Sequence, residues 1–148
     1  NKLDLSAANW RGHNIKMKKS SNLNLFTNAI DALTTRASGA RFEIKAKRYL
    51  QQQGLTIIEQ NFNAKGDELD IIAQQDNKLV FVEVRYRKSQ QYGGAAASVT
   101  TQKQARLRKA AQAYFKQQGL NSQHTFYRFD IIAFDGDEQT LTWIKNAF

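Results

Sequence analysis

Apolar residues recur at helical or strand spacing along most of the chain after residue 35. The segment ARFEIKAKRYLQQQ has helical spacing, with Ser38 as its predicted N-cap and Gly54 as its predicted C-terminal stop. Two apolar stripes fit this helix, and the sequence leaves both open. They are Ala40, Ile44, Lys47 and Leu50, or Phe42, Ala46, Tyr49 and Gln53.

The spacing then changes to that of strands. Four runs are rich in β-branched and aromatic residues, and the C-terminal TLTWIKNAF is a last strand or a tail. These runs are LTIIEQNF, ELDIIAQ, KLVFVEVRYR and TFYRFDIIAF. Before the fourth run, Ser98 is the predicted N-cap of a long helix that ends before Gly119. The order α-β-β-β-α-β(-β) predicts the α/β class, with helices flanking a mixed β-sheet.

The second and third runs form a predicted hairpin with Asp76 and Asn77 at its tip. Three residue pairs follow from this register: Ile72 with Phe81, Asp70 with Glu83, and Glu68 with Arg85. Strand alternation gives one face a wholly apolar set, namely Leu69, Ile71, Ala73, Val80, Val82 and Val84. The other face begins as core near the tip and ends as a cluster of charges.

The opposed carboxylates Asp70 and Glu83 carry an energetic cost. Opposed residues bring their Cβ atoms to about 4.5–5.5 Å. Two ionised carboxylates about 5 Å apart repel by roughly 3 kcal/mol at an effective dielectric of about 20. A divalent cation would offset this repulsion, because Mg²⁺ binds one or two carboxylates together with waters and a substrate phosphate. A salt-bridge network in which Arg85 neutralises Glu68 is the alternative, and the spacing leaves both open.

The chain is strongly basic. It has 22 Lys and Arg against 13 Asp and Glu, a net charge of +9 and a pI near 9.9. This favours a polyanionic partner, nucleic acid before an anionic membrane surface, although solvated surface cations give the same balance. The chain has no Cys, which excludes disulfides and thiolate metal sites and is typical of a cytoplasmic protein. No apolar run approaches the roughly 20 residues that span a bilayer, so no membrane partner is expected.

Residues 1–35 are polar and rich in Asn and Ser. They are interpreted as a flexible or loosely docked N-terminal arm, with a short helix at about Asn24–Leu33. The only Met, Met17, is a candidate native start. Residues 36–148 are the predicted folded domain. Its His124 lies far in sequence from His13, so neither a zinc site nor histidine catalysis is expected.

Two hairpin motifs resemble the PD-(D/E)xK nuclease signature, an acid on one strand followed by acid-x-base on its neighbour. They are GDELDIIA, which contains Asp70, and FVEVRYR, which contains Glu83, Val84 and Arg85. With ARFEIKAKRYL, YGGAAASVTTQKQ and RFDIIAF in order, residues 38–133 are similar to the YraN family, an uncharacterised bacterial group that resembles archaeal Holliday junction resolvases. The resemblance implies a restriction-endonuclease-like core and an endonuclease, dependent on Mg²⁺ or Mn²⁺, that hydrolyses structured or branched DNA.

The resemblance also implies residue roles. Asp70 and Glu83 are the expected metal ligands, with the Val84 carbonyl as a third and Glu43 as the helical acid of resolvase-like groups. Glu68, on the same strand face as Asp70, is expected to orient a ligand or to replace one. The expected catalytic set is Glu43, Asp70, Glu83 and Arg85. Because resolvases act on two-fold symmetric junctions, a homodimer is also expected, although no segment identifies its seam.

The helix that follows Ser98 has five basic residues and no acid. This favours phosphate contacts, with an ordinary solvated helix as the alternative. Its predicted buried side is Leu107, Ala110, Ala111, Tyr114 and Phe115. The residues expected to bind nucleic acid are Lys45, Arg87, Lys103 and Arg106. Candidates for stacking on bases, with a place in the core as the alternative, are Tyr86, Tyr92, Tyr127 and Phe129.

One residue departs from the nuclease signature. Arg85 stands where these nucleases carry Lys. Arginine stays protonated and cannot act as a general base, but it can hold a phosphate through two hydrogen bonds. The alternative function is therefore a catalytically weak or inactive nucleic-acid-binding module, an accessory factor in DNA repair, recombination or uptake. Asp130 is expected to support either Arg85 or Arg128.

Overall fold

The computed structural model describes residues 21–148. Its elements are α1 (Ser21–Gln52), β1 (Thr56–Ala64), β2 (Asp67–Gln75), β3 (Lys78–Arg87), the 3₁₀ helix η1 (Gln91–Gly93), α2 (Gly94–Ala97), α3 (Thr101–Gln118), β4 (Tyr127–Asp135) and β5 (Leu141–Ile144). The residues from Thr35 to Phe148 form one compact unit. The candidate start at Met17, His13 and most of the predicted arm lie outside the described residues.

Helix α1 extends further toward the N-terminus than predicted. Ser38 lies inside the helix, so its prediction as an N-cap is wrong. The preceding turns contain no Pro, and the single Gly39 costs only about 1 kcal/mol of helix propensity, too little to end a helix. The predicted stop is confirmed, because Gly54 adopts φ 92° and the chain leaves the helix there.

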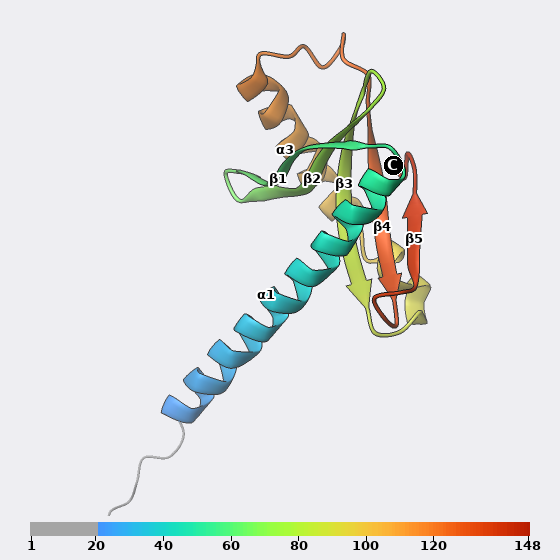
Figure 1. Cartoon of the computed structure of the whole chain (residues 1–148). Coiled ribbons are helices and arrows are strands. Elements are labelled where there is room, and N and C mark those ends of the chain that lie inside the picture. Colours follow the sequence, from blue (N-terminus) through green and yellow to red (C-terminus); the bar gives the residue numbers. More distant parts are fainter. Residues whose placement is uncertain (1–20) are drawn as a thin grey trace, which may run out of the picture. The chain divides into compact units, whose positions relative to one another are not determined.

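The five strands form one mixed sheet in the order β1-β2-β3-β4-β5 (Figure 1). Neighbouring strands are antiparallel except β3 and β4, which are parallel. A parallel pair requires a long crossover connection, and the segment containing α2 and α3 supplies it. The predicted α/β class and element order are confirmed, and the architecture is a restriction-endonuclease-like core.

Each face of the sheet has its own core. On one face α3 buries the five residues that were predicted, Leu107, Ala110, Ala111, Tyr114 and Phe115, against Ile72, Phe81 and Phe129. On the other face, α1 packs against Ile71, Val80, Val82 and Ile132 through Phe42, Ala46 and Leu50. The buried stripe of α1 agrees with the second predicted set at Phe42 and Ala46 and adds Leu50. Tyr49 is only partly buried and Gln53 is exposed, so that set is wrong at its last position, and Ile44 of the first set is half exposed.

The hairpin register is confirmed only between the tip and the pair Ile71–Val82, because the predicted pairs Asp70–Glu83 and Glu68–Arg85 lie beyond the end of the β2–β3 ladder. Ile72 pairs with Phe81, and Gln75 with Lys78 on either side of the two-residue tip. One face assignment was wrong, because Leu69 packs in the α3 core rather than with Ile71. The ladder between β2 and β3 ends at Ile71, so strict alternation does not continue to Leu69, which instead pairs with Phe62 of β1.

The helix after the β3 loop begins later than predicted. Thr100 is the N-cap of α3, and its side chain accepts a hydrogen bond from the Lys103 amide, so the assignment of Ser98 as N-cap is wrong. Ser98 closes the short helix α2, where its Oγ donates to the Ala95 carbonyl at 2.5 Å. The predicted end is confirmed, since Gly119 adopts φ 67° directly after α3. No helix within residues 21–148 has the length and apolar character needed to cross a membrane.

Candidate active site

The predicted charge cluster lies where β2 and β3 separate. The ladder between these strands ends at the pair Ile71–Val82. Just beyond it, the Val84 amide donates a 2.8 Å hydrogen bond to Oδ2 of Asp70. A side-chain carboxylate therefore replaces a backbone acceptor, which fixes Asp70 beside Glu83 as the hairpin register predicts.

Glu83 is a deeply buried acid, with a side chain only 2% exposed. Its Oε1 lies 3.4 Å from Nζ of Lys103 and 3.7 Å from Nη1 of Arg85. Its Oε2 is buried and has no hydrogen-bond donor among the described residues when the carboxyl groups are ionised. A buried polar atom without a partner is rare in native proteins and points to a missing proton, water or ion.

Burial raises the pKa of Glu83 to about 8, and the charge of Asp70 adds to this effect, although Lys103 and Arg85 oppose it. Burial also raises the pKa of Asp70, against the hydrogen bond from Val84. With a pKa of about 8, the Glu83 carboxyl group is protonated near neutral pH and can donate a hydrogen bond to Asp70. A divalent cation would occupy the same space and satisfy the same oxygens.

Two further acids lie near this pair, Glu43 close to Asp70 and Glu68 close to Glu43. Glu43 of α1 is half-buried, and its pKa is raised by burial and then by the charges of Asp70 and Glu68, while a hydrogen bond from Asn61 lowers it. Within residues 21–148 no three His, Cys or acidic side chains form a group that could hold a metal ion, so the structure does not bring Glu43, Asp70 and Glu83 together as a three-carboxylate site.

Arg85 takes a different partner from the one that the salt-bridge alternative required. Its Nε donates a 2.9 Å hydrogen bond to Oγ of Ser98, and its guanidinium approaches Glu83. Among the described ion pairs, none joins Arg85 to Glu68. The contact between Arg85 and Ser98 could not be predicted from the sequence, because Ser98 fits a helix cap equally well. Asn61 was not predicted as a site residue either. Its distinguishing feature is a φ of 52° within a strand, which only the structure reveals.

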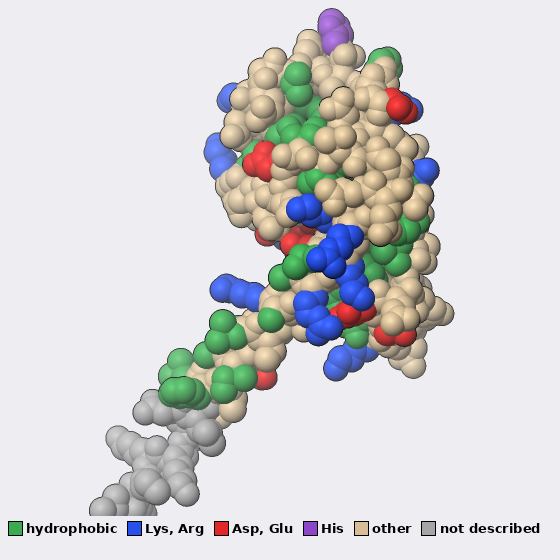
Figure 2. Space-filling view, in the orientation of Figure 1, with side chains coloured by type: hydrophobic (Ala, Val, Ile, Leu, Met, Phe, Trp, Pro, Cys, Tyr) green, Lys and Arg blue, Asp and Glu red, His purple; other side chains and the backbone are tan. Residues whose placement is uncertain are grey.

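The residues expected to bind nucleic acid lie in four different settings. Lys103 is in the carboxylate cluster. Arg87 lines a pocket at the end of β3. Lys45 pairs with Glu138 at 2.8 Å. Figure 2 shows Lys and Arg side chains gathered near acidic ones on one face of the molecule. Arg106 donates to Oδ1 of Asp67 at 2.9 Å and to the Gly66 carbonyl.

Asp130 supports Arg128 rather than Arg85. The residue is completely buried, and its carboxylate accepts from Nε of Arg128 at 2.9 Å and from Nε1 of Trp143 at 3.0 Å. The Asn146 amide donates to the same carboxylate. This cluster joins the end of β5 to β4 and has a structural role.

The carboxylate oxygens of Glu83 and its neighbour Asp70 are suitable ligands for a hard divalent cation. Mg²⁺ prefers oxygen ligands and uses one or two carboxylates, with waters and a substrate phosphate completing its shell. Asp70 and Glu83 supply two adjacent carboxylates, one with an unpartnered buried oxygen. The Val84 carbonyl belongs to the same strand segment. The residues present therefore fit such an ion with two carboxylates rather than three.

The chain is similar to proteins of one family. The model of the "Uncharacterised protein family UPF0102" matches residues 42–134, which include Glu43, Asp70, Glu83 and Lys103. A UPF0102 protein of Aeromonas hydrophila is 48% identical over 112 residues, which are 76% of this chain and 85% of that protein. One from Aliivibrio salmonicida is 46% identical over 112 residues, 76% of this chain and 91% of the relative. One from Vibrio cholerae is 45% identical over 115 residues, 78% and 94% of the two chains. The chain therefore belongs to UPF0102, the YraN family.

Proposed function

We propose that this chain is a Mg²⁺- or Mn²⁺-dependent endonuclease that hydrolyses phosphodiester bonds in structured DNA, including branched DNA. The observation that carries the proposal is the buried Oε2 of Glu83, which lies beside a second carboxylate, Asp70, and accepts no hydrogen bond from any residue of the part of the chain that the structure describes. Such a pair is costly for stability. Binding of a cation between the two carboxylates explains why the fold retains this costly pair.

Each residue of the cluster has a separate proposed task. Asp70 and Glu83 hold the cation, and the Val84 amide holds the Asp70 carboxylate in place. Glu43 and Glu68 add negative charge, and Glu43 can orient a water that belongs to the metal shell. The cation, when bound, polarises the phosphoryl oxygen and makes water a stronger nucleophile.

The two cations beside Glu83 are the proposed phosphate contacts. Arg85 cannot accept a proton, but its guanidinium is oriented by Ser98 and retains donors for phosphate oxygens. Lys103 brings an ammonium group to 3.4 Å from Glu83. In this chain, α3 thus supplies the ammonium group that the nuclease signature places on the strand.

The wider charge distribution supports a nucleic-acid partner. The net charge is +9, and α3 carries basic residues without a single acid. Neutralising phosphates with Lys and Arg releases counterions and drives association. Because a branched junction offers two equivalent bonds, we also propose that a homodimer is the active species. The absence of Cys is typical of a cytoplasmic protein, and we propose that location.

The proposal is tested by incubating the purified chain with labelled linear, flapped, single-stranded and four-way-junction DNA in Mg²⁺ or Mn²⁺. The wild type is expected to cleave at least one structured substrate, and Asp70→Asn none. Glu59→Gln is the matched control, because Glu59 is a half-buried acid of β1 outside the cluster. Cleavage that survives in Asp70→Asn would rule out this site.

A nucleic-acid-binding module without catalysis is the second candidate, favoured by Arg85. Its guanidinium occupies the position of the usual Lys and is already engaged by Ser98 and Glu83. This function predicts salt-dependent binding of DNA by both wild type and Asp70→Asn, with no cleavage by either. In that case the chain would act as an accessory factor in repair, recombination or uptake.

A further inference from the structure

A second site lies at the end of β3, beyond the carboxylate cluster. A cavity of about 380 Å³ opens there, a size typical of small-ligand pockets. The residues that line it are Arg87, Lys88, Ser89, Gln91, Tyr92, Gly94, Ala97 and Ser98. Two of them are cations and none is an acid, so the pocket attracts an anionic ligand.

The pocket is contiguous with the proposed active site. Ser98 lines the pocket, and its Oγ accepts the hydrogen bond from Arg85, whose guanidinium approaches Glu83. Side chains two residues apart on a strand share a face, so Glu83, Arg85 and Arg87 form a row along β3. They follow one another at intervals of about 6.8 Å.

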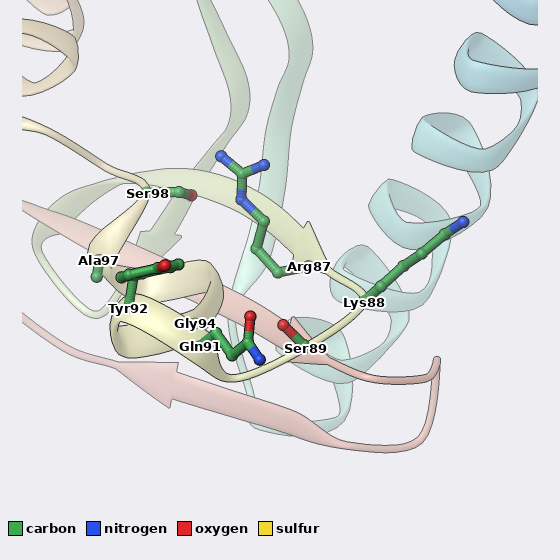
Figure 3. Close-up of a pocket in the computed structure, with 8 residues that line it drawn as sticks. All are labelled: Arg87, Lys88, Ser89, Gln91, Tyr92, Gly94, Ala97 and Ser98. Atoms are coloured by element: carbon green, nitrogen blue, oxygen red, sulfur yellow. The ribbon is translucent and has the colours of Figure 1, made fainter.

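Tyr92 gives the pocket an aromatic surface. Its side chain is 98% exposed, although Tyr normally buries most of its ring. Its backbone adopts φ 56° and ψ 34°, a left-handed conformation that is unusual for a bulky residue. Figure 3 shows Arg87 reaching toward Ser98 with the Tyr92 side chain nearby, whereas Lys88 points away.

Contacts with the end of β4 anchor the loop that carries Tyr92. Oδ1 of Asp135 accepts a 2.7 Å hydrogen bond from the Ala95 amide. Gly94 packs so closely on this carboxylate that a Cβ atom would lie 2.5 Å from Oδ1. The Gly136 amide also donates to the Arg87 carbonyl at 2.8 Å. The backbone that follows Tyr92 is thus anchored to the end of β4.

We propose that this pocket binds one unpaired nucleotide next to the phosphodiester bond that reacts. The base stacks on Tyr92, and its phosphate binds Arg87, with Lys88 adding to the local positive potential. A base inside a duplex has both faces covered by its neighbours, so only a nucleotide outside the stack can use the ring. The inference rests on the proposed nuclease function and specifies its substrate class, which is DNA with an unpaired nucleotide at the cleavage point rather than continuous duplex.

The test uses the full chain in EDTA, so that binding is measured without cleavage. The probes are a single-stranded oligonucleotide that contains one 2-aminopurine, whose fluorescence falls on stacking, and a duplex of the same sequence. Tyr92→Ala is expected to abolish the quench and to weaken single-strand binding by roughly 5- to 100-fold. Duplex binding should change less than about twofold. Tyr92→Phe keeps the ring and should behave as wild type.

Three further variants make the result specific. Phe126 is 65% exposed and lies outside the pocket, so Phe126→Ala should leave binding and quench unchanged. Arg87→Ala should weaken single-strand binding and reduce its logarithmic salt slope by about one. Asp70→Asn should retain the quench, because it changes the carboxylate cluster alone.

The outcomes separate this inference from the proposed nuclease. A wild type that binds with a Tyr92-dependent quench but never cleaves in Mg²⁺ would uphold the pocket and overturn the nuclease. Cleavage together with unchanged binding by Tyr92→Ala would overturn the pocket alone, and is the result expected if Tyr92 docks another protein. Equal losses of affinity for single-stranded and duplex DNA in Tyr92→Ala would also overturn the pocket. Absence of all nucleic-acid binding would overturn both.

Discussion

The Val84 amide donates a 2.8 Å hydrogen bond to Oδ2 of Asp70. This contact stands directly after Ile71–Val82, the last ladder pair between β2 and β3. A strand that leaves its neighbour must satisfy its freed amides in another way, and here an aspartate does so. The same hydrogen bond holds Asp70 next to Glu83. The separation of β2 from β3 therefore also creates the pair of carboxylates in the candidate site.

Substitution of Asp70 should separate catalysis from folding. In Asp70→Asn, the amide oxygen can still accept from Val84, but the ligand charge is lost. We expect cleavage to fall on the order of 10³-fold, equivalent to several kcal/mol of lost stabilisation. The free energy of unfolding of the metal-free protein should stay the same or rise by about 1 kcal/mol, because a buried charge is removed. Calorimetric Mg²⁺ binding as strong as in wild type would contradict the site.

Stability of the metal-free protein should depend on pH through Glu83. Its pKa in the folded state, about 8, lies above the ordinary value of 4.5. The folded protein therefore binds more protons than the unfolded chain between these values, and its stability falls as pH rises across that window, by up to a few kcal/mol. Denaturant titrations in EDTA from pH 5 to 8 measure this.

Mg²⁺ and Glu83→Gln provide the two controls for this pH dependence. Saturating Mg²⁺ replaces the proton, so the fall should shrink and metal affinity should increase toward pH 8. Glu83→Gln cannot titrate and should give a flatter profile. A wild-type profile as flat as that of Glu83→Gln would show that the carboxyl group is not held protonated by the fold.

Lys103 should matter for cleavage more than its position on a basic helix suggests. Its Nζ lies 3.4 Å from Oε1 of Glu83, whereas Lys116 lies in the exposed last turn of the same helix. Lys103→Ala should reduce kcat by roughly 10- to 100-fold, the loss of one phosphate contact in a water-poor site. Lys116→Ala should change kcat by less than about twofold. Equal effects of the two variants would mean that only the overall charge of α3 contributes.

Much of the hairpin could be predicted because local rules determine it. Asp76-Asn77 fits a two-residue turn, and alternation then fixes which residues oppose Phe81 and Val82. The acids Asp70 and Glu83 follow from that register, and so their adjacency was predictable. The placement of Leu69 was not, because alternation stops where the ladder ends, and the sequence does not mark that residue.

Contacts between distant segments were harder to predict. Ser98 and Thr100 both suit a helix cap, and only the packing of α2 decides that Thr100 caps α3 while Ser98 binds Arg85. Arg106 illustrates the same limit, since periodicity places it on the exposed side of α3 but does not reveal Asp67 opposite it. Partners 39 residues apart depend on how β1, β2 and α3 meet.

Arg106 should contribute to stability through the β1–β2 turn. It bridges Oδ1 of Asp67 at 2.9 Å and the Gly66 carbonyl at 3.0 Å. Because its side chain is 55% exposed, solvent screening reduces the value of the pair, and Arg106→Ala should cost about 1 kcal/mol, or roughly 2–4 °C in Tm. Lys109 is the matched control, 75% exposed and 3.8 Å from the same carboxylate. Lys109→Ala should cost less than about 0.5 kcal/mol.

DNA binding by the same variant tests the other expectation for Arg106. If the residue contacts phosphate, Arg106→Ala should lower the logarithmic salt slope of DNA binding by about one. An unchanged slope together with the lower Tm would assign Arg106 to the fold alone.

Asp130 should be the acid on which the fold depends most. It is completely buried, and it accepts from Arg128, from Nε1 of Trp143 and from the Asn146 amide. Asp130→Ala leaves the 14% exposed guanidinium of Arg128 without its carboxylate, and removing one partner of a buried pair costs about 3–5 kcal/mol. This corresponds to a fall in Tm on the order of 10 °C. The double variant Asp130→Ala/Arg128→Ala should lose less than the two single losses combined, because the uncompensated charge is gone. Additive losses would mean that the two side chains stabilise the fold independently and that Asp130 acts mainly through the end of β5.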